Sequence, residues 1–440
     1  MKFDINKYKS IIWAAVAVVA LGGGIGIGYA INNSDSDSTS TDYVLNPRIK
    51  PLFNVNRVDP PLVNNPSLLS LPSELNVALA TDGAGVINDK SFNDATGKGL
   101  LDIYGLSDAL SDHATLYRVP TDTNATTIIQ VYQDLYNSFS DKDDATVRKV
   151  IIAPGFGHSA AISKFWEANS TGYDDLYFLL LDQPPTYGNP VANLKNTYSI
   201  EFDVSKSGFK AAMLASLYLD AIGDANPMVG TWGGGDFPGV TSFMRGFVSG
   251  VIYYNQQVKA AAKPDVKIVK FNTDADYLNS GFELGGGTEK ADYLIDKGAD
   301  VILPVAGAQT KDLIDAIKRS QRKDEVKIVG VDTDQSITYE EDKGLFITSI
   351  TKNLRKAAYE GYKEITSNST QIDGTYDPDQ DSTGSYTGDD SRNFSSYTKQ
   401  FVIDQDNVNS AIWKYIYEKV DDLPVVVQSW EHAFAYIKSQ

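Results

Sequence analysis

Short apolar runs alternate along this chain with stretches of helical periodicity. The apolar runs have the length of buried strands, and they lie at Asn76–Ala80, Ala114–Tyr117, Lys149–Ala153, Leu176–Leu181, Met228–Thr231, Lys267–Phe271, Asp300–Pro304, Lys327–Val331 and Phe346–Ile350. Apolar residues spaced three and four apart predict helices at Ser205–Ala221, Phe243–Tyr254, Thr288–Lys297, Val408–Val420 and Gln428–Ser439, and a short strand is predicted at Phe401–Ile403. The alternation predicts an α/β fold of parallel sheets with helices on both faces, in two similar lobes.

The first residues have a different pattern. Ile11 to Ile31 carries no charge, lysines lie before it, and aspartates follow it. At ~1.5 Å per residue this segment spans roughly 30 Å, enough for a bilayer core. It predicts a membrane helix within residues 1–31, with the globular part outside the cytoplasm. A cleaved signal peptide is the alternative, because Gly28-Tyr29-Ala30 is a small-x-small site.

Two further segments depart from the α/β pattern. Residues 32–73 are polar and then rich in proline, which is typical of an extended stalk. Residues 367–396 are acidic and rich in Ser, Thr and Gly, which predicts a surface insertion. Within it, Asp377, Asp379 and Asp381 have the spacing of calcium ligands. Ser382 replaces the glycine of a calcium loop, and no glutamate closes it, so a solvated loop is the favoured reading.

Composition excludes several classes of protein. The chain has 39 basic and 57 acidic residues among 440, a net charge of −18. Such a surface repels nucleic acid and anionic lipid. Cysteine is absent and histidine occurs only three times. Disulfides, thiolate metal sites and cysteine nucleophiles are therefore excluded, and we expect neither a metal nor a cofactor.

Polar and aromatic side chains follow the first predicted strand. The turn after Ala80 carries Asp82, and the next helix begins near Phe92 and Asn93. An acid, an aromatic ring and an amide suit a neutral polar ligand with a flat face better than a phosphate. The alternative is a packing turn, in which Asp89 caps the helix and Phe92 lies in the core.

Other strand ends carry candidate residues too. Because parallel strands open at one edge of a sheet, the loops that follow them converge. His158 follows a glycine-rich turn, where a capping or surface histidine is the favoured reading of this residue taken alone, and Trp232 is either a cleft wall or a core residue. The remaining candidates are Phe282, Gly307, Asp332 and Lys352.

The ordered segments DKSFN, APGF, GTWGGGDFPGV, KGADVILPVAG, IVGVDTDQ and TSITK make the chain resemble the basic membrane protein family, substrate-binding proteins of ABC transporters that include purine nucleoside receptors. The resemblance implies a type I periplasmic-binding-protein fold, with two Rossmann-like lobes, a hinge of three crossings and a ligand in the cleft. Family members are typically lipoproteins, and the predicted helix would replace the lipid here.

The resemblance also implies roles for individual residues. Phe92 would stack on a purine, with Phe282 opposite, and Asn93 would bond the base edge. Asp82 and Asp332 would accept hydrogen bonds from ribose hydroxyls. Gly307 would contribute backbone contact and Lys352 would donate to the ligand. His158 would lie near another polar contact.

We therefore expect an extracytoplasmic, membrane-tethered protein that binds a nucleoside and delivers it to an ABC permease. Residues 74–205 would form the first lobe, residues 206–345 the second, and residues 346–440 a crossing segment and helices that complete both. Purine, pyrimidine nucleoside and another small polar metabolite all stay open as ligands. One alternative is a surface interaction protein built on a degenerate cleft. A nucleoside hydrolase is disfavoured, because Asp82, Asp89 and Asp94 are too scattered for its metal cluster.

Overall fold

The computed structural model describes residues 75–82, 87–140, 146–155, 157–183, 195–367, 395–399 and 410–440. The predicted membrane segment, the stalk, most of the insertion with its calcium-like aspartates, and the strand predicted at 401–403 lie outside these ranges. Within the described ranges, no helix is both long enough and apolar enough to cross a bilayer.

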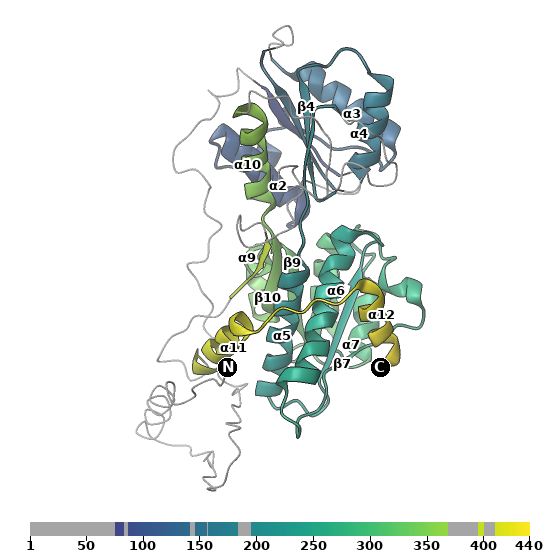
Figure 1. Ribbon diagram of the computed structural model, residues 1–440, viewed down its shortest axis with the longest axis vertical. Coiled ribbons are helices and arrows are strands. Elements are labelled where there is room, and N and C mark those ends of the chain that lie inside the picture. Colours follow the sequence, from purple (N-terminus) through teal and green to yellow (C-terminus); the bar gives the residue numbers. More distant parts are fainter. Residues whose placement is uncertain are drawn as a thin grey trace.

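The described residues form two lobes, one above the other in Figure 1. The amino lobe is built on a parallel sheet in the order β2-β1-β3-β4-β5. Its strands are β1 (Val77–Ala80), β2 (Tyr117–Arg118), β3 (Lys149–Pro154), β4 (Leu176–Leu181) and β5 (Thr197–Ile200). Every residue of β1, β3 and β4 is buried, because helices cover both faces of the sheet.

Two helices lie on each face of the amino lobe sheet (Figure 1). They are α2 (Phe92–Tyr104) with α10 (Leu354–Ser367) on one face, and α3 (Ala125–Ser138) with α4 (Gly157–Ala168) on the other. A short 3₁₀ helix (Leu110–Asp112) follows α2. Arg355 of α10 forms a two-pronged ion pair with the buried carboxylate of Asp102 in α2, which fixes the late helix α10 to this lobe.

The carboxyl lobe has a larger sheet in the order β11-β10-β9-β8-β6-β7. Its strands are β6 (Met228–Gly233), β7 (Lys267–Ile268), β8 (Val301–Val305), β9 (Lys327–Asp332), β10 (Phe346–Lys352) and β11 (Ser395–Tyr397). All neighbouring pairs are parallel except β10 and β11. The antiparallel strand β11 thus covers the outer edge of β10.

Helices again flank the carboxyl lobe sheet, and two of them carry a second layer. The helices are α5 (Ser205–Ala221), α6 (Pro238–Tyr253), α7 (Thr288–Asp296), α8 (Thr310–Arg319), α9 (Gln335–Thr338), α11 (Ser410–Asp422) and α12 (Trp430–Ser439). Short helical turns lie at Tyr254–Val258, Asp274–Tyr277, Gly307–Gln309 and Glu340–Leu345. α11 packs on α5 and α12 packs on α6, as Figure 1 shows.

The described residues pass between the lobes twice. The chain leaves the amino lobe after β5, at residues 201–204, and returns at Asn353 between β10 and α10. The next described strand after α10, β11, lies in the carboxyl lobe again, where it pairs with β10. This is the two-lobe architecture of periplasmic binding proteins that the sequence predicts.

Several predicted elements differ from the observed ones at their ends. The strand predicted at Ala114–Tyr117 begins only at Tyr117, because Leu116 donates its N–H to His113 in a turn. The strand predicted at Lys267–Phe271 ends at Ile268, and the N–H of Phe271 bonds the hydroxyl of Tyr277 at 2.9 Å instead of a neighbouring strand. The strand at Leu176–Leu181 and the helix at Ser205–Ala221 have the predicted bounds.

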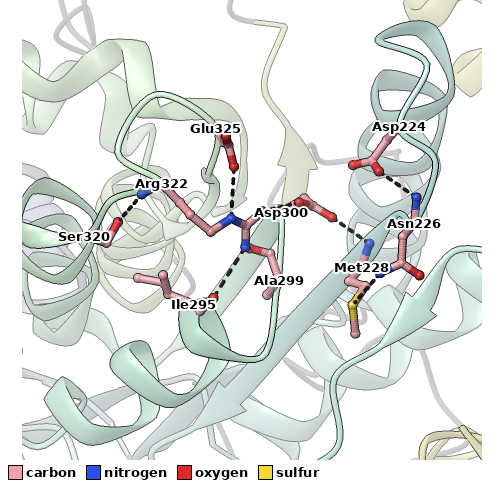
Figure 2. Close-up of polar contacts among 9 residues, drawn as sticks. All are labelled: Asp224, Asn226, Met228, Ile295, Ala299, Asp300, Ser320, Arg322 and Glu325. Atoms are coloured by element: carbon pink, nitrogen blue, oxygen red, sulfur yellow. Dashed lines mark hydrogen bonds and ion pairs between the residues drawn. The ribbon is translucent and has the colours of Figure 1, made fainter.

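An ion-pair cluster fastens the amino ends of the carboxyl lobe strands (Figure 2). Asp300, just before β8, accepts the N–H of Met228 at the start of β6 at 2.7 Å. The guanidinium of Arg322 pairs with Asp300 and donates to the carbonyl of Ala299 at 2.9 Å. β6 and β8 are therefore held at the ends opposite to their carboxyl-terminal loops.

Candidate ligand-binding site

A cavity of about 390 Å³ lies between the two lobes. This volume is within the usual range of small-molecule sites. Residues from strand ends and helix starts of both lobes line it: Asp82, Asp89, Phe92, Asn93, Gly155, Asp182, Phe237, Gly239, Val240, Phe243, Phe282, Glu283, Leu284, Val305, Gly307, Ala308, Val331, Asp332 and Lys352. The loops that follow the strands therefore converge on one cavity, as the sequence predicts.

On the amino lobe side, one amide organises two carboxylates. The Nδ2 of Asn93 donates to Asp82 at 3.0 Å and to Asp89 at 3.1 Å, and its Oδ1 accepts the N–H of Asp82 at 3.3 Å. Both amide protons of Asn93 are thus used within the protein. The bond to a base edge expected of Asn93 requires one of them to be released when a ligand binds.

Asp89 caps the helix that carries Phe92. Its carboxylate accepts the backbone N–H groups of Ser91 at 2.9 Å, Asn93 at 2.9 Å and Asp94 at 3.1 Å. The N–H groups of Asn93 and Asp94 are free donors of the first turn of α2, and that of Ser91 directly precedes this turn. The capping role that the sequence left open is confirmed, and it holds Phe92 at the edge of the cavity rather than in the core.

Backbone conformation places two aspartates at strand ends. Asp332 ends β9 with φ of 62°, and Asp182 follows β4 with φ of 68°. Aspartate adopts this left-handed conformation more readily than most residues. Gly155, after β3, has φ of 100°, and a Cβ there would lie 2.9 Å from the Cβ of Asp82. Glycine at this position lets Asp82 face the cavity.

A hydrogen bond between Ser91 and Asp332 joins the two lobes beside the cavity. The hydroxyl of Ser91, at the start of α2, donates to Oδ2 of Asp332 at 2.8 Å. Both residues are buried. The lobes are therefore in contact beside the cavity, and Asp332 already accepts a hydrogen bond from one hydroxyl.

Lys352 lies where the lobes meet. Its ammonium donates to Asp182 of the amino lobe at 2.6 Å and to the carbonyl of Gly239 in the carboxyl lobe at 3.0 Å. Oδ1 of Asp332 is 3.8 Å away. The ammonium also lies over the rings of Phe243, at 4.8 Å, and Phe92, at 5.7 Å. A buried ammonium needs such partners because burial removes its hydration.

Four aromatic rings supply apolar walls. Phe92 comes from the amino lobe, and Phe237, Phe243 and Phe282 come from the carboxyl lobe. The rings of Phe237 and Phe282 are tilted against each other with centroids 5.9 Å apart. Both lobes therefore offer an aromatic surface to a planar solute.

The charge of the lining is strongly negative. Five carboxylates line the cavity, and Lys352 is the single basic residue among the described residues that do so. A doubly charged anion such as a phosphate would meet repulsion here. Within the part of the chain that the structure describes, no group of three His, Cys, Asp or Glu side chains is placed to hold a metal ion.

This arrangement agrees with the comparison to protein families. Residues 76–381 match the family described as Bmp, ABC transporter substrate-binding protein PnrA-like. That span is more than half of the chain, and it contains every residue that lines the cavity. The chain belongs to the Bmp family. It is therefore a solute-binding protein of the ABC transporter class and not an enzyme.

Solved structures are similar to this chain at low sequence identity. An ABC transporter solute-binding protein from Aeropyrum pernix K1 is 18% identical, with a TM-score of 0.53 over 82% of this chain and 85% of that chain. Another, from Conexibacter woesei DSM 14684, is 15% identical, with a TM-score of 0.48 over 80% of this chain and 99% of that one. No curated protein matches the chain.

Seven of the residues that the sequence proposes for this Bmp-family site line the cavity: Asp82, Phe92, Asn93, Phe282, Gly307, Asp332 and Lys352. His158 does not. It lies in the first turn of α4, which directs it into the core, where Nδ1 meets the hydroxyl of Tyr132 at 2.7 Å and Nε2 meets the carbonyl of Thr81 at 3.1 Å. Burial lowers the pKa of His158 to about 4, so it is neutral.

Trp232 is also absent from the cavity wall. It is fully buried in β6, and its indole Nε1 donates to Oε1 of Gln309 at 3.0 Å. The core reading that the sequence left open is therefore the observed one. Trp232 supports the site from behind and does not face a ligand.

Sequence reasoning missed several lining residues. Asp182, Phe237, Phe243 and Glu283 line the cavity. Asp182 directly follows a predicted strand, which is the same signal that identified Asp332, so it could have been found. Phe243 lies within α6, and nothing in its spacing distinguishes it from a core residue.

The pKa of Asp182 gives the site a pH dependence that can be tested. Burial raises this pKa to about 6, although the Lys352 ammonium opposes the rise. The folded state thus binds the Asp182 proton more tightly than the unfolded state, with its usual pKa near 3.8. This contribution to stability is fully present below about pH 4 and is lost as the pH rises through about 6.

We expect that substitution Asp182→Asn removes this pH dependence. Between pH 4 and 7, the free energy of unfolding of the natural protein should fall relative to the variant by up to ~3 kcal/mol. Urea denaturation of both proteins across this range measures the difference. Burial, and then the charge of Asp182, raise the pKa of Glu201 to about 7, so the comparison is made with Glu201→Gln present in both proteins. If the free energies of unfolding of the two proteins changed with pH in parallel, Asp182 would not titrate in this range.

Proposed function

We propose that this Bmp-family protein captures a nucleoside, with a purine preferred, in the cavity between its lobes and delivers it outside the cytoplasm to an ABC permease. The observation that carries the proposal is the pairing of aromatic walls with carboxylates in one cavity. A nucleoside has the matching parts, since its base is flat and apolar on both faces and its ribose carries hydroxyl donors.

In this proposal the rings hold the base. Phe92 and Phe282 reach the cavity from opposite lobes. Stacking of a base on an aromatic ring contributes ~1–3 kcal/mol. A base held between the two lobes favours the closed arrangement, because it contacts both rings only when the lobes are together.

The carboxylates hold the sugar. Asp332 and Asp82 accept hydrogen bonds from ribose hydroxyls, as Asp332 does from Ser91. Hydrogen bonds to a charged acceptor are worth about 1.5–3 kcal/mol each. The ammonium of Lys352 lies 3.8 Å from Oδ1 of Asp332, where it offsets the charge of the nearby carboxylates, and it donates to the ligand once the lobes close.

Transport requires release as well as capture. The crossings after β5 and β10 act as the hinge, and the contact of Ser91 with Asp332 forms and breaks as the lobes move. A membrane tether through residues 1–31 would keep the protein beside its permease. The ligand is passed on without any change in its covalent bonds.

The excess of carboxylates predicts selectivity against nucleotides. In isothermal calorimetry, we expect adenosine to bind at least ~10-fold more tightly than its monophosphate, because the phosphate dianion meets the acidic lining. Adenine alone serves as the control for the contribution of the base. Equal affinity for adenosine and its monophosphate would contradict the proposed use of the carboxylates.

A further inference from the structure

A glycine-rich loop brings one of the aromatic rings to the cavity. The glycine loop, residues 280–287, has the sequence SGFELGGG and carries Phe282, Glu283 and Leu284 into the lining. Gly281 and Gly285 have φ of 70° and 96°. Glycines lose more conformational freedom on ordering than other residues, so such a loop holds a fixed shape only if other groups fix it.

The side chain of Gln309 fixes one half of the glycine loop. Gln309 is fully buried in the turn after β8. Its Nε2 donates to the carbonyl oxygens of Ser280 at 3.0 Å, Gly281 at 3.1 Å and Glu283 at 3.2 Å. These carbonyls flank Phe282 on both sides. A Cβ at Gly286 would lie 2.7 Å from Nε2, so glycine there allows the close approach.

Trp232 determines which way this amide points. The indole N–H is only a donor, and it bonds Oε1 of Gln309 at 3.0 Å. Nε2 of Gln309 must therefore face the glycine loop, where it donates to backbone carbonyl oxygens. The amide is oriented by the core and does not depend on a ligand.

The other half of the glycine loop is held by a carboxylate. Asp312, in the first turn of α8, accepts the N–H of Gly285 at 2.9 and 3.0 Å and that of Gly287 at 3.0 Å. The N–H of Gly281 also donates to the carbonyl of Gly234 at 3.1 Å. The loop thus has fixed backbone bonds on both sides of the segment anchored by Gln309.

We propose that Gln309 is a positioning residue that presents Phe282 to the ligand before the ligand arrives. The inference rests on the proposed function, in which Phe282 stacks on the base. Without the Gln309 amide, the segment around Phe282 has to be ordered at the moment of binding, and that ordering lowers affinity. Gln309 itself does not touch the ligand, because it is absent from the cavity lining.

A double-mutant cycle tests this role. Gln309→Met keeps the volume and removes the amide, and Phe282→Ala removes the ring. With inosine or adenosine in calorimetry, we expect Gln309→Met to weaken binding about fivefold and Phe282→Ala about tenfold or more. In the double variant, affinity should equal that of Phe282→Ala alone, since the loop then has no ring to present.

Hydrogen exchange supplies a measurement that needs no ligand. Amides of the glycine loop should exchange about tenfold faster in Gln309→Met, while those of β8 and β9 keep their protection. Asn255→Leu is the matched control. It removes another amide of the same lobe, which bonds both backbone groups of Val266 at 2.9 Å, and should leave the glycine loop unchanged.

The outcomes separate the two proposals. Unchanged exchange in the glycine loop, or an equal loss of affinity with and without Phe282, overturns the role of Gln309. If the natural protein binds no nucleoside, the proposed function fails. Hydrogen exchange then tests the role of Gln309 by itself: faster exchange of the glycine loop in Gln309→Met supports Gln309 as the residue that positions the loop.

Discussion

Substitution Asp332→Asn is expected to weaken nucleoside binding by about 10- to 100-fold in calorimetry. The carboxylate of Asp332 lines the cavity and already accepts the Ser91 hydroxyl at 2.8 Å. A neutral amide oxygen is a weaker acceptor, and the amide nitrogen cannot accept from a hydroxyl at all. Asparagine tolerates the φ of 62°, so the loss reflects the charge and not the backbone.

Substitution Asp334→Asn, two residues further along the chain, is the control for Asp332→Asn. Asp334 caps α9 by accepting the N–H of Ser336, and it does not line the cavity. Asparagine caps helices as well as aspartate does. Asp334→Asn should therefore leave affinity within about twofold of the natural protein. If Asp332→Asn and Phe92→Ala were both silent, the surface interaction protein would become the better reading.

Substitution Lys352→Met is expected to lower the free energy of unfolding at pH 7 by about 3–5 kcal/mol. Lys352 is buried, and its removal leaves Asp182 without its 2.6 Å partner and Asp332 without its nearest cation. Methionine fills most of the volume, so the loss measures uncompensated charge. Urea denaturation at constant pH gives the value.

Two further variants make this result specific. In Lys352→Met with Asp182→Asn, part of the lost stability should return, because the unpaired carboxylate is gone. Lys363→Met is the matched control, since the side chain of Lys363 is 44% exposed and pairs with Glu360 at 3.4 Å on α10. Such a pair contributes below about 1 kcal/mol. A loss of similar size at both lysines would contradict the network around Lys352.

The sequence predicts the fold well because its signals are local. Runs such as Leu176–Leu181 are apolar throughout, and a strand buried on both faces needs only that property. β5 and β11 escape prediction, because Thr197–Ile200 and Ser395–Tyr397 contain polar residues and become strands only by pairing with β4 and β10. Edge strands of this kind depend on their neighbours more than on their own sequence.

The sequence identifies residues of the cavity lining where a polar side chain follows the end of a predicted strand, as for Asp82 and Asp332. His158 fits the same rule and still points into the core. Its direction depends on Tyr132 in α3, a partner 26 residues away that a local pattern cannot reveal. Trp232 likewise lies in a strand covered on both faces, so alternation along β6 does not say which side faces the cavity.

The helices packed behind the carboxyl lobe have a practical consequence for observing closure. α12 is tied to that lobe by Lys438 with Asp274 and by the rings of Phe434 and Tyr277, whose centroids are 5.3 Å apart. Fluorophores attached to α12 and to α4 would therefore each follow one rigid half of the molecule. Since the chain has no cysteine, introduced thiols can be labelled without side reactions. Energy transfer between the two dyes would report hinge rotation in solution as solute is added.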